Sequence, residues 1–306
     1  MIVEFEPHGD AADAMSSRIR LKRFETPSDT EVLMYGINST CNKSLQNKYK
    51  NYKRRVLFNY WSSCEFTCRN DAGNGFEMTD YFTEVYSVCK YTTEWMNKVS
   101  NCHKFKSIFF PIDTTYIPFN ITKEYDVGYH GGIHGNIHKD CLDKIKQFKY
   151  SFLSQQHYDN LTKPPMLPYE AMLDNLSKVK ISINYHVVPL NDKLKSFIKQ
   201  YSFWKDNKAW SYIDSLNIFP QFKVRQHESA LCKCLNLVYK DPWNIVEDYY
   251  EPNKDFIYFN NNEELPYLIN NILKSWEYHQ PMIESAYSKC LTYTAENLYK
   301  RICNDK

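Results

Sequence analysis

The clearest pattern in this sequence lies in residues 223–250, which read KVRQHESALCKCLNLVYKDPWNIVEDYY. Arg225 and Glu228 stand three positions apart at the start of a predicted short helix, and the apolar run 235–238 predicts a strand after it. The first turn of a helix offers unpaired backbone N–H groups and a positive dipole end, which suit phosphate. An arginine there adds a bidentate phosphate ligand, and a glutamate can accept hydrogen bonds from sugar hydroxyls. The stretch therefore suggests a nucleotide-sugar site. The alternative is an exposed i,i+3 ion pair.

Strands and helices are predicted to alternate on both sides of this stretch. Predicted strands of the first half cover residues 2–5, 31–37, 56–60, 85–88 and 107–110, with helices at 11–23, 39–55 and 91–99. In the second half, strands at 125–129 and 179–185 precede 235–238, with helices at 138–148, 169–177, 263–273 and 281–303 and two helical patterns within 190–218. Thr92 or Thr93 is expected near the cap of the 91–99 helix. This alternation predicts parallel, Rossmann-like sheets.

Several short motifs follow one another in the second half. They read YDVGYHG at 125–131, KISINYH at 180–186, RQHE at 225–228, EDYY at 247–250, EEL at 263–265 and YT at 293–294 before Arg301. In this order and spacing, residues 126–306 resemble the CgeB-like glycosyltransferases of the group 1 type, and residues 85–111 resemble them more weakly. The resemblance implies an α/β protein with the GT-B fold, in which two Rossmann-like domains with parallel sheets face a central cleft.

The resemblance also implies a domain organisation and an activity. Two prolines and no periodicity in residues 111–124 indicate a boundary there. We expect an acceptor domain at 1–118, a donor domain at 119–285 and a terminal helix at 286–306 that crosses back to the first domain. The expected activity is transfer of a sugar from a nucleotide-diphosphate sugar to a hydroxyl acceptor, a glycan or a glycoprotein.

The donor-binding residues expected from the resemblance and from strand ends form one group: Gly131, Gly132, Asn184, His186, Lys223, Arg225, Glu228 and Glu247. Arg225 is also a predicted catalytic residue, because it would neutralise the leaving diphosphate. Glu228 matches an acidic residue that binds the donor ribose in related enzymes. Two positions depart from the expected pattern. Cys234 stands where the family usually has glycine, and Pro220 stands where many retaining enzymes have glutamate, which puts a retaining mechanism of their kind in doubt.

The segment 130–138 reads HGGIHGNIH and allows three interpretations. Histidines four positions apart on a helix could bind a metal, but Gly131, Gly132 and Gly135 disfavour a helix there. A glycine-rich loop between a strand and a helix suits close approach to a phosphate, and a plain turn is the third possibility. Asn184 and His186 follow a buried strand, at the edge where ligands bind in open α/β sheets. His186 could also be only a capping side chain.

An inverting reaction would need a general base for the acceptor hydroxyl. His8 follows the first predicted strand and Asp10 is close enough in sequence to orient it, so both are predicted catalytic residues. Some inverting GT-B enzymes place a catalytic histidine after their first strand. Glu65 and Asp80 are further candidates from the same edge.

Composition limits the partners. The sequence contains no Asp-x-Asp, the motif through which GT-A enzymes hold a divalent cation, so we expect a metal-independent reaction without a cofactor. A net charge of +2 makes nucleic acid an unexpected partner, and no apolar run approaches the ~18 residues of a membrane span. The start is unlike a signal peptide and the cysteines are scattered, which favours the cytoplasm.

An AT-rich composition, with 25 Tyr and 18 Phe, would suit a large DNA virus. The enzyme would then work in the host cytoplasm or the virion, for example on capsid glycans. Two alternatives stay open: a catalytically inactive GT-B module that binds a glycan or a protein, and a glucosyltransferase acting on DNA bases.

Overall fold

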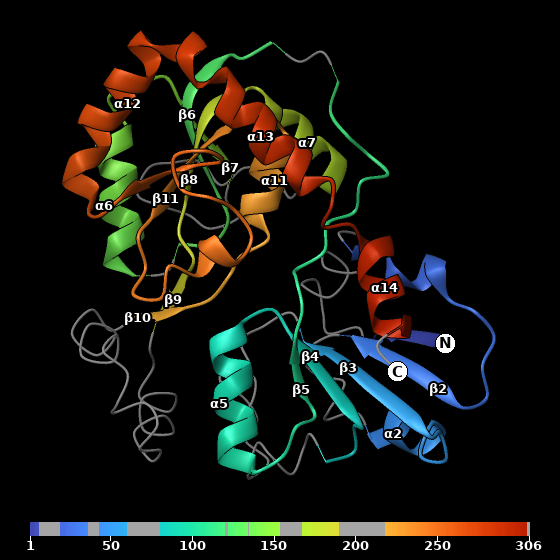
Figure 1. Cartoon of the computed structure of the whole chain (residues 1–306). Helices are drawn as coiled ribbons and strands as arrows, with labels where there is room; N and C mark the ends of the chain where they lie inside the picture. The colour runs from blue at the N-terminus through green and yellow to red at the C-terminus, as the bar shows by residue number, and fades with distance from the viewer. Residues whose placement is uncertain are drawn as a thin grey trace. The chain divides into compact units, whose positions relative to one another are not determined.

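The computed structural model describes residues 1–5, 19–35, 43–59, 80–119, 122–133, 135–153, 167–189 and 218–304. These residues form two compact units (Figure 1). The first unit comprises the described residues of Met1–Asp113, Leu190–Phe222 and Ala295–Lys306. The second comprises those of Thr114–Pro189 and Lys223–Thr294. Among the described residues, no helix is long and apolar enough to cross a membrane.

The first unit contains a parallel sheet in the order β1-β2-β3-β4-β5. Its strands are β1 (Ile2–Phe5), β2 (Glu31–Tyr35), β3 (Arg54–Asn59), β4 (Glu84–Ser87) and β5 (Phe105–Ser107). The helices are η1 (Leu21–Phe24), α2 (Lys43–Lys48), α5 (Lys90–Ser100) and α14 (Ala295–Asn304), and the short strand β10 (Ile218–Pro220) also belongs here. Each described strand of the sheet lies beside the preceding one, so the strand order does not reverse among them.

The second unit contains a parallel sheet in the order β12-β11-β8-β6-β7. Its strands are β6 (Tyr125–His130), β7 (Tyr150–Leu153), β8 (Val179–Asn184), β11 (Leu235–Tyr239) and β12 (Ile257–Phe259), and β9 (Val187–Pro189) is a further short strand. The helices are α6 (Asn136–Ile145), α7 (Tyr169–Ser177), α11 (Arg225–Leu231), η2 (Ile245–Asp248), η3 (Asn262–Glu264), α12 (Leu265–Lys274), η4 (Trp276–His279) and α13 (Gln280–Cys290).

The strand order of the second unit reverses around β6. The chain runs from β6 outward to β7 and then returns to β8 on the other side of β6. Because parallel crossovers are right-handed, this reversal puts helices on both faces of the sheet. Accordingly, α6 packs with α12 on one face, and α7, α11 and α13 cluster on the other (Figure 1). In sheets of this order, ligands bind outside the carboxyl ends of the strands at the reversal, which here means the ends of β6 and β8.

The predicted α/β class with two parallel sheets is confirmed, whereas several element bounds were wrong. The predicted helix at 281–303 is two helices, α13 and α14. Thr292 follows α13 and its hydroxyl donates to the Lys289 carbonyl at 2.7 Å, a local bond that competes with helix continuation. Residues 39–55 do not form one helix either, since α2 covers only part of them and β3 begins at Arg54.

Other differences are local. Cys89, rather than Thr92 or Thr93, is the N-cap of α5, and the Thr93 hydroxyl donates back to the Cys89 carbonyl at 2.8 Å. The strand predicted at 107–110 is β5 and ends at Ser107. The short strands β7, β9, β10 and β12 were not predicted, because three or four residues carry too little periodicity. The predicted helical patterns at 190–217 and most of the predicted helix at 11–23 lie outside the described residues.

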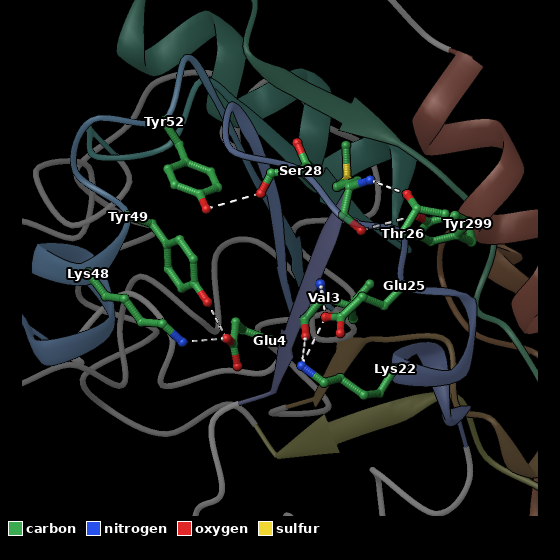
Figure 2. Close-up of polar contacts among 11 residues, drawn as sticks. Val3, Glu4, Lys22, Glu25, Thr26, Ser28, Lys48, Tyr49, Tyr52 and Tyr299 are labelled. Carbon is green, nitrogen blue, oxygen red and sulfur yellow. Dashed lines mark hydrogen bonds and ion pairs between the residues drawn. The ribbon is translucent and has the colours of Figure 1, made fainter.

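The strand β1 lies at the edge of its sheet, and side chains cover the backbone groups that face away from β2 (Figure 2). The Val3 N–H donates to Glu25 Oε2 at 2.9 Å, and Lys22 Nζ donates to the Val3 carbonyl at 2.8 Å. The Met1 carbonyl accepts the Thr26 N–H at 3.2 Å and the Tyr299 hydroxyl of α14 at 3.1 Å. We call Lys22, Glu25, Thr26 and Tyr299 the edge cover. An open edge invites pairing with another chain, so this cover protects the sheet.

Candidate functional site

Helix α11 is polar in sequence and yet completely buried. All seven residues from Arg225 to Leu231 are buried. Five consecutive polar side chains each contact a different residue of the second unit: Arg225 contacts Tyr129, Gln226 contacts His186, His227 contacts Tyr250, Glu228 contacts His130 and Ser229 contacts Ser182. Arg225 is 8% exposed and Glu228 is 2% exposed, so they are not the exposed ion pair that the sequence allowed as an alternative.

Arg225 meets the glycine loop that follows β6. Gly131 has a φ of +106°, and a Cβ added to it would lie 2.3 Å from Arg225 Nη2. Glycine is therefore required at this position for two reasons: the backbone conformation, and the space that the guanidinium occupies. Arg225 Nη1 donates to the Tyr129 hydroxyl at 3.4 Å, which donates in turn to the Gly132 carbonyl at 2.7 Å. The structure thus brings together three predicted donor-binding residues and adds Tyr129, which the sequence analysis did not single out.

The charge of Arg225 has no carboxylate partner among the described residues. Among the residues that the structure describes, no aspartate or glutamate forms an ion pair with it, and its hydrogen bond goes to Tyr129. A nearly buried positive charge is unfavourable unless an anion compensates it. The surroundings of Arg225 therefore fit a bound anion.

The Glu228 side chain of α11 lies next to the last residue of β6. Its Oε2 is 3.4 Å from Nε2 of His130, the last residue of that strand. His138, by contrast, packs in the core with its ring centroid 4.7 Å from that of Tyr185. His134 lies outside the described residues. Within the described ranges, no group of three or more His, Cys, Asp or Glu is arranged to hold a metal, and His130 and His138 have separate surroundings.

His186 joins the end of β8 to the turn that enters α11. Its Nδ1 accepts the backbone N–H of Lys223 at 2.9 Å. Because that N–H can only donate, Nε2 carries the ring proton and donates to Gln226 Oε1 at 3.4 Å. Burial, together with the positive charge of Arg225, holds the pKa of His186 well below its usual value. The ring is therefore neutral, and it fixes the backbone just ahead of Arg225.

Asn184 belongs to a buried polar layer beneath α11. Its Nδ2 donates to Asn236 Oδ1 of β11 at 2.7 Å, and Ser229 of α11 donates to Ser182 of β8 at 2.7 Å. Buried amides and hydroxyls are stable only when they are hydrogen-bonded. The Ser229–Ser182 bond therefore holds the helix on the sheet, and the Asn184–Asn236 bond joins β8 to β11.

Three further positions that the sequence analysis named, each among the described residues, do not contact Arg225. Glu247 is exposed in η2 and accepts a hydrogen bond from Tyr258 at 3.1 Å, so no contact among the described residues joins it to Arg225. Asp80 is an exposed partner of Lys104 at 3.1 Å. Cys234 is buried just before β11, where its thiol donates to the Val179 carbonyl at 3.3 Å. His8, Asp10 and Glu65 lie outside the described residues.

The fold of this chain is similar to that of solved glycosyltransferases. No protein-family model matches the sequence, and no curated protein is significantly similar to it. HepE (Alr3699) from Anabaena, in complex with UDP-glucose, gives a TM-score of 0.56 at 10% identity, over 89% of this chain and 78% of that chain. A glycosyltransferase from Rickettsia africae ESF-5 gives 0.55 at 10% identity, over 98% and 83%.

Sucrose-phosphate synthase from Thermosynechococcus elongatus gives a TM-score of 0.56 at 8% identity, over 90% of this chain and 74% of that chain. At such identities the likeness concerns the fold and not the activity. Both units are built on a parallel sheet with helices, as in a Rossmann-like domain. The chain therefore has the α/β architecture of the GT-B glycosyltransferases, with two Rossmann-like units.

Proposed function

We propose that this protein is a glycosyltransferase that moves a sugar from a nucleotide-diphosphate sugar to a hydroxyl of a glycan or glycoprotein acceptor. The observation that carries the proposal is Arg225, a nearly buried cation without a carboxylate partner among the described residues, packed against Gly131 at the reversal of the second sheet. The fold supports it as well, since the structurally similar HepE was solved with UDP-glucose. The order of motifs in residues 126–306 favours the CgeB-like group within this fold.

The proposed roles follow from the chemistry of glycosyl transfer. The acceptor oxygen forms a bond to the anomeric carbon of the sugar, the bond from that carbon to the diphosphate oxygen breaks, and negative charge grows on the leaving nucleotide. Arg225 is the group that would stabilise this charge, because guanidinium binds phosphate oxygens through paired N–H groups and stays protonated. Glu228 would accept hydrogen bonds from ribose hydroxyls. The acceptor proton would pass to a base, for which His8 with Asp10 remains the prediction.

We propose that no metal takes part. The sequence contains no Asp-x-Asp, and the fixed charge of Arg225 can do the work that a divalent cation does in other transferases. EDTA should therefore leave donor binding unchanged.

A thermal-shift panel tests the proposal. The panel contains UDP, GDP, dTDP, CMP and their sugar conjugates, each with and without EDTA. A ligand that binds the native state raises the melting temperature by mass action, so one nucleotide group should give a shift that survives EDTA. Arg225→Ala should reduce the shift strongly, whereas Lys274→Ala, which removes an exposed charge from α12 of the same unit, should keep it.

The alternatives give different results. No shift with any nucleotide in well-folded protein would contradict the proposed donor site and favour a binding module. A nucleotide shift without donor hydrolysis or transfer would also indicate an inactive module. Salt-sensitive binding to duplex DNA would identify the DNA-base enzyme instead.

A further inference from the structure

We propose that Tyr129 is the positioning residue of Arg225, and that its hydroxyl couples the guanidinium to the loop of Gly131 and Gly132 so that both meet the donor diphosphate as one preformed unit. The inference rests on the proposed function for its ligand and on the contacts of Tyr129 for its geometry.

The hydroxyl of Tyr129 bridges the two parts of the site. A phenol has one proton, and Tyr129 donates it to the Gly132 carbonyl at 2.7 Å. A lone pair of the same oxygen then accepts from Arg225 Nη1 at 3.4 Å. Burial raises the pKa of Tyr129 to about 12, so the hydroxyl keeps its proton throughout the neutral range. The bridge therefore has a fixed direction, from arginine to tyrosine to the loop carbonyl.

The ring of Tyr129 is itself held in place. It stacks on Phe152 of β7 with centroids 6.3 Å apart and meets His138 of α6 edge-on at 6.0 Å. The guanidinium carbon of Arg225 lies 5.8 Å from the ring centroid, and its nitrogens lie against Gly131. A free arginine side chain samples many rotamers, and contacts on the ring and on the glycine restrict them before a ligand arrives.

The hydroxyl is the part of this arrangement that can be removed alone. Tyr129→Phe keeps the ring, its stacking and the space beside Gly131, but it breaks the bridge from Arg225 to the Gly132 carbonyl. We expect the dissociation constant for UDP to rise about fivefold to tenfold, as for the loss of one hydrogen bond. Inorganic pyrophosphate, the second probe, has no nucleoside. Its dissociation constant should rise by the same factor, because the lost hydrogen bond acts on the binding of the diphosphate.

A double-mutant cycle separates positioning from general damage. UDP and pyrophosphate dissociation constants are measured by calorimetry for the native protein, Tyr129→Phe, Arg225→Ala and the double variant. If Tyr129 acts through Arg225, Tyr129→Phe has no further effect once the arginine is gone. Full additivity, or unchanged binding in the single variant, would overturn the inference. Tyr293→Phe is the matched control, since its hydroxyl also donates to a carbonyl, that of Tyr249, at 2.7 Å, and its binding should equal that of the native protein.

A second readout needs no nucleotide. Phenylglyoxal modifies arginine, and peptide mass spectrometry measures its rate at Arg225 in the ligand-free protein. Tyr129→Phe should raise that rate severalfold, and Tyr293→Phe should not. An unchanged rate would overturn the positioning role. A raised rate in a protein that binds neither UDP nor pyrophosphate would keep Tyr129 as the positioning residue and reject the proposed function.

Discussion

The two parallel sheets of this chain are wound differently, and the candidate site belongs to only one of them. In the first unit, each described strand lies beside the strand before it. In the second, the order reverses around β6, and Gly131, His186 and Arg225 gather where the chain changes direction. Helices on opposite faces diverge at such a reversal and leave room at the strand ends. Among the described strands, the order therefore distinguishes the sheet with a reversal, where the candidate donor site lies, from the sheet without one.

Two arginines, one in each unit, differ in how their charge is compensated. In the first unit, Glu84 of β4 binds Arg54 at 2.5 and 3.0 Å and Lys106 at 3.2 Å, so carboxylate and cations compensate one another. In the second unit, Arg225 is about as little exposed to solvent as Arg54, and no carboxylate among the described residues pairs with it. Removal of one partner from a little-exposed ion pair is destabilising, whereas a buried cation without a carboxylate partner among the described residues is a candidate for binding an anionic ligand.

The largest expected effect comes from adding one methyl group at the site. Gly131→Ala should weaken donor binding at least about tenfold, because the new Cβ would lie 2.3 Å from Arg225 Nη2 and displace the guanidinium. Calorimetry with UDP measures the loss. The matched control is Gly135→Ala. Gly135 also has a positive φ, +77°, but its added Cβ would have no atom within 4 Å.

Both variants should lose about 1 kcal/mol of unfolding free energy from backbone strain. Only Gly131→Ala should lose donor affinity. Equal binding by the two variants would show that the displacement of Arg225 is not what glycine prevents.

In the first unit, the expected effect is on stability and not on binding. Glu84→Gln removes the carboxylate that pairs with Arg54, whose side chain is 11% exposed, and should lower the unfolding free energy by about 2–4 kcal/mol. Urea denaturation measures this loss. Glu263→Gln removes an exposed carboxylate that pairs with Lys144 at 2.7 Å and should cost at most about 0.5 kcal/mol. A change in the UDP affinity of Glu84→Gln would contradict the expectation that this pair affects stability and not donor binding.

Acid should loosen the second unit through His186. Its pKa in the folded protein lies below the ordinary 6.5 of the unfolded chain. Between these two pKa values the unfolded chain binds a proton that the folded protein does not. The contribution of His186 to the free energy of unfolding is therefore fully present above pH 6.5 and is lost as the pH falls below it. The loss is at most about 1.4 kcal/mol per pH unit.

The variant His186→Asn tests this pH dependence. Its amide oxygen can still accept the Lys223 N–H, but the side chain does not titrate. The free energy of unfolding, measured in urea at pH 7.5, 6.5 and 5.5, should fall less steeply in the variant than in the native protein. Parallel curves would mean that His186 does not carry the dependence.

The smallest effect on stability is expected at the edge of the first sheet. Lys22→Ala combined with Glu25→Ala removes an exposed ion pair and should cost less than about 1 kcal/mol. It also uncovers the Val3 backbone of β1, so sedimentation should detect concentration-dependent association. Lys254→Ala with Glu251→Ala removes a similar i,i+3 pair, at 2.8 Å, that covers no strand edge. Association in the control variant alone would contradict the role of the edge cover.

The sequence was sufficient for the kind of fold, because periodicity and β–α alternation are local properties. The order of the strands is not local, so neither the reversal around β6 nor the sequential first sheet could be predicted. The resemblance singled out Arg225 and Gly131, but not their direct contact. Tyr129 was missed, and His130 was considered only as a possible metal ligand, because a strand position alone does not say which side chains turn toward a helix nearly 100 residues later. The sequence left an exposed ion pair of Arg225 and Glu228 open as an alternative. The burial of α11 depends on partners in β6, in and just after β8, and after η2.

The edge cover has a consequence for how the chain matures during translation. The Tyr299 hydroxyl reaches the Met1 carbonyl across 298 positions of sequence, and Arg54 donates to the Ile302 carbonyl across 248. A nascent chain on the ribosome can therefore assemble its second unit before the first unit receives its final helix. Until residues near 299 have emerged, the strand β1 has an incomplete cover. We expect ribosome-bound intermediates that stop before α14 to be more sensitive to proteases at the sheet of the first unit than chains that include α14.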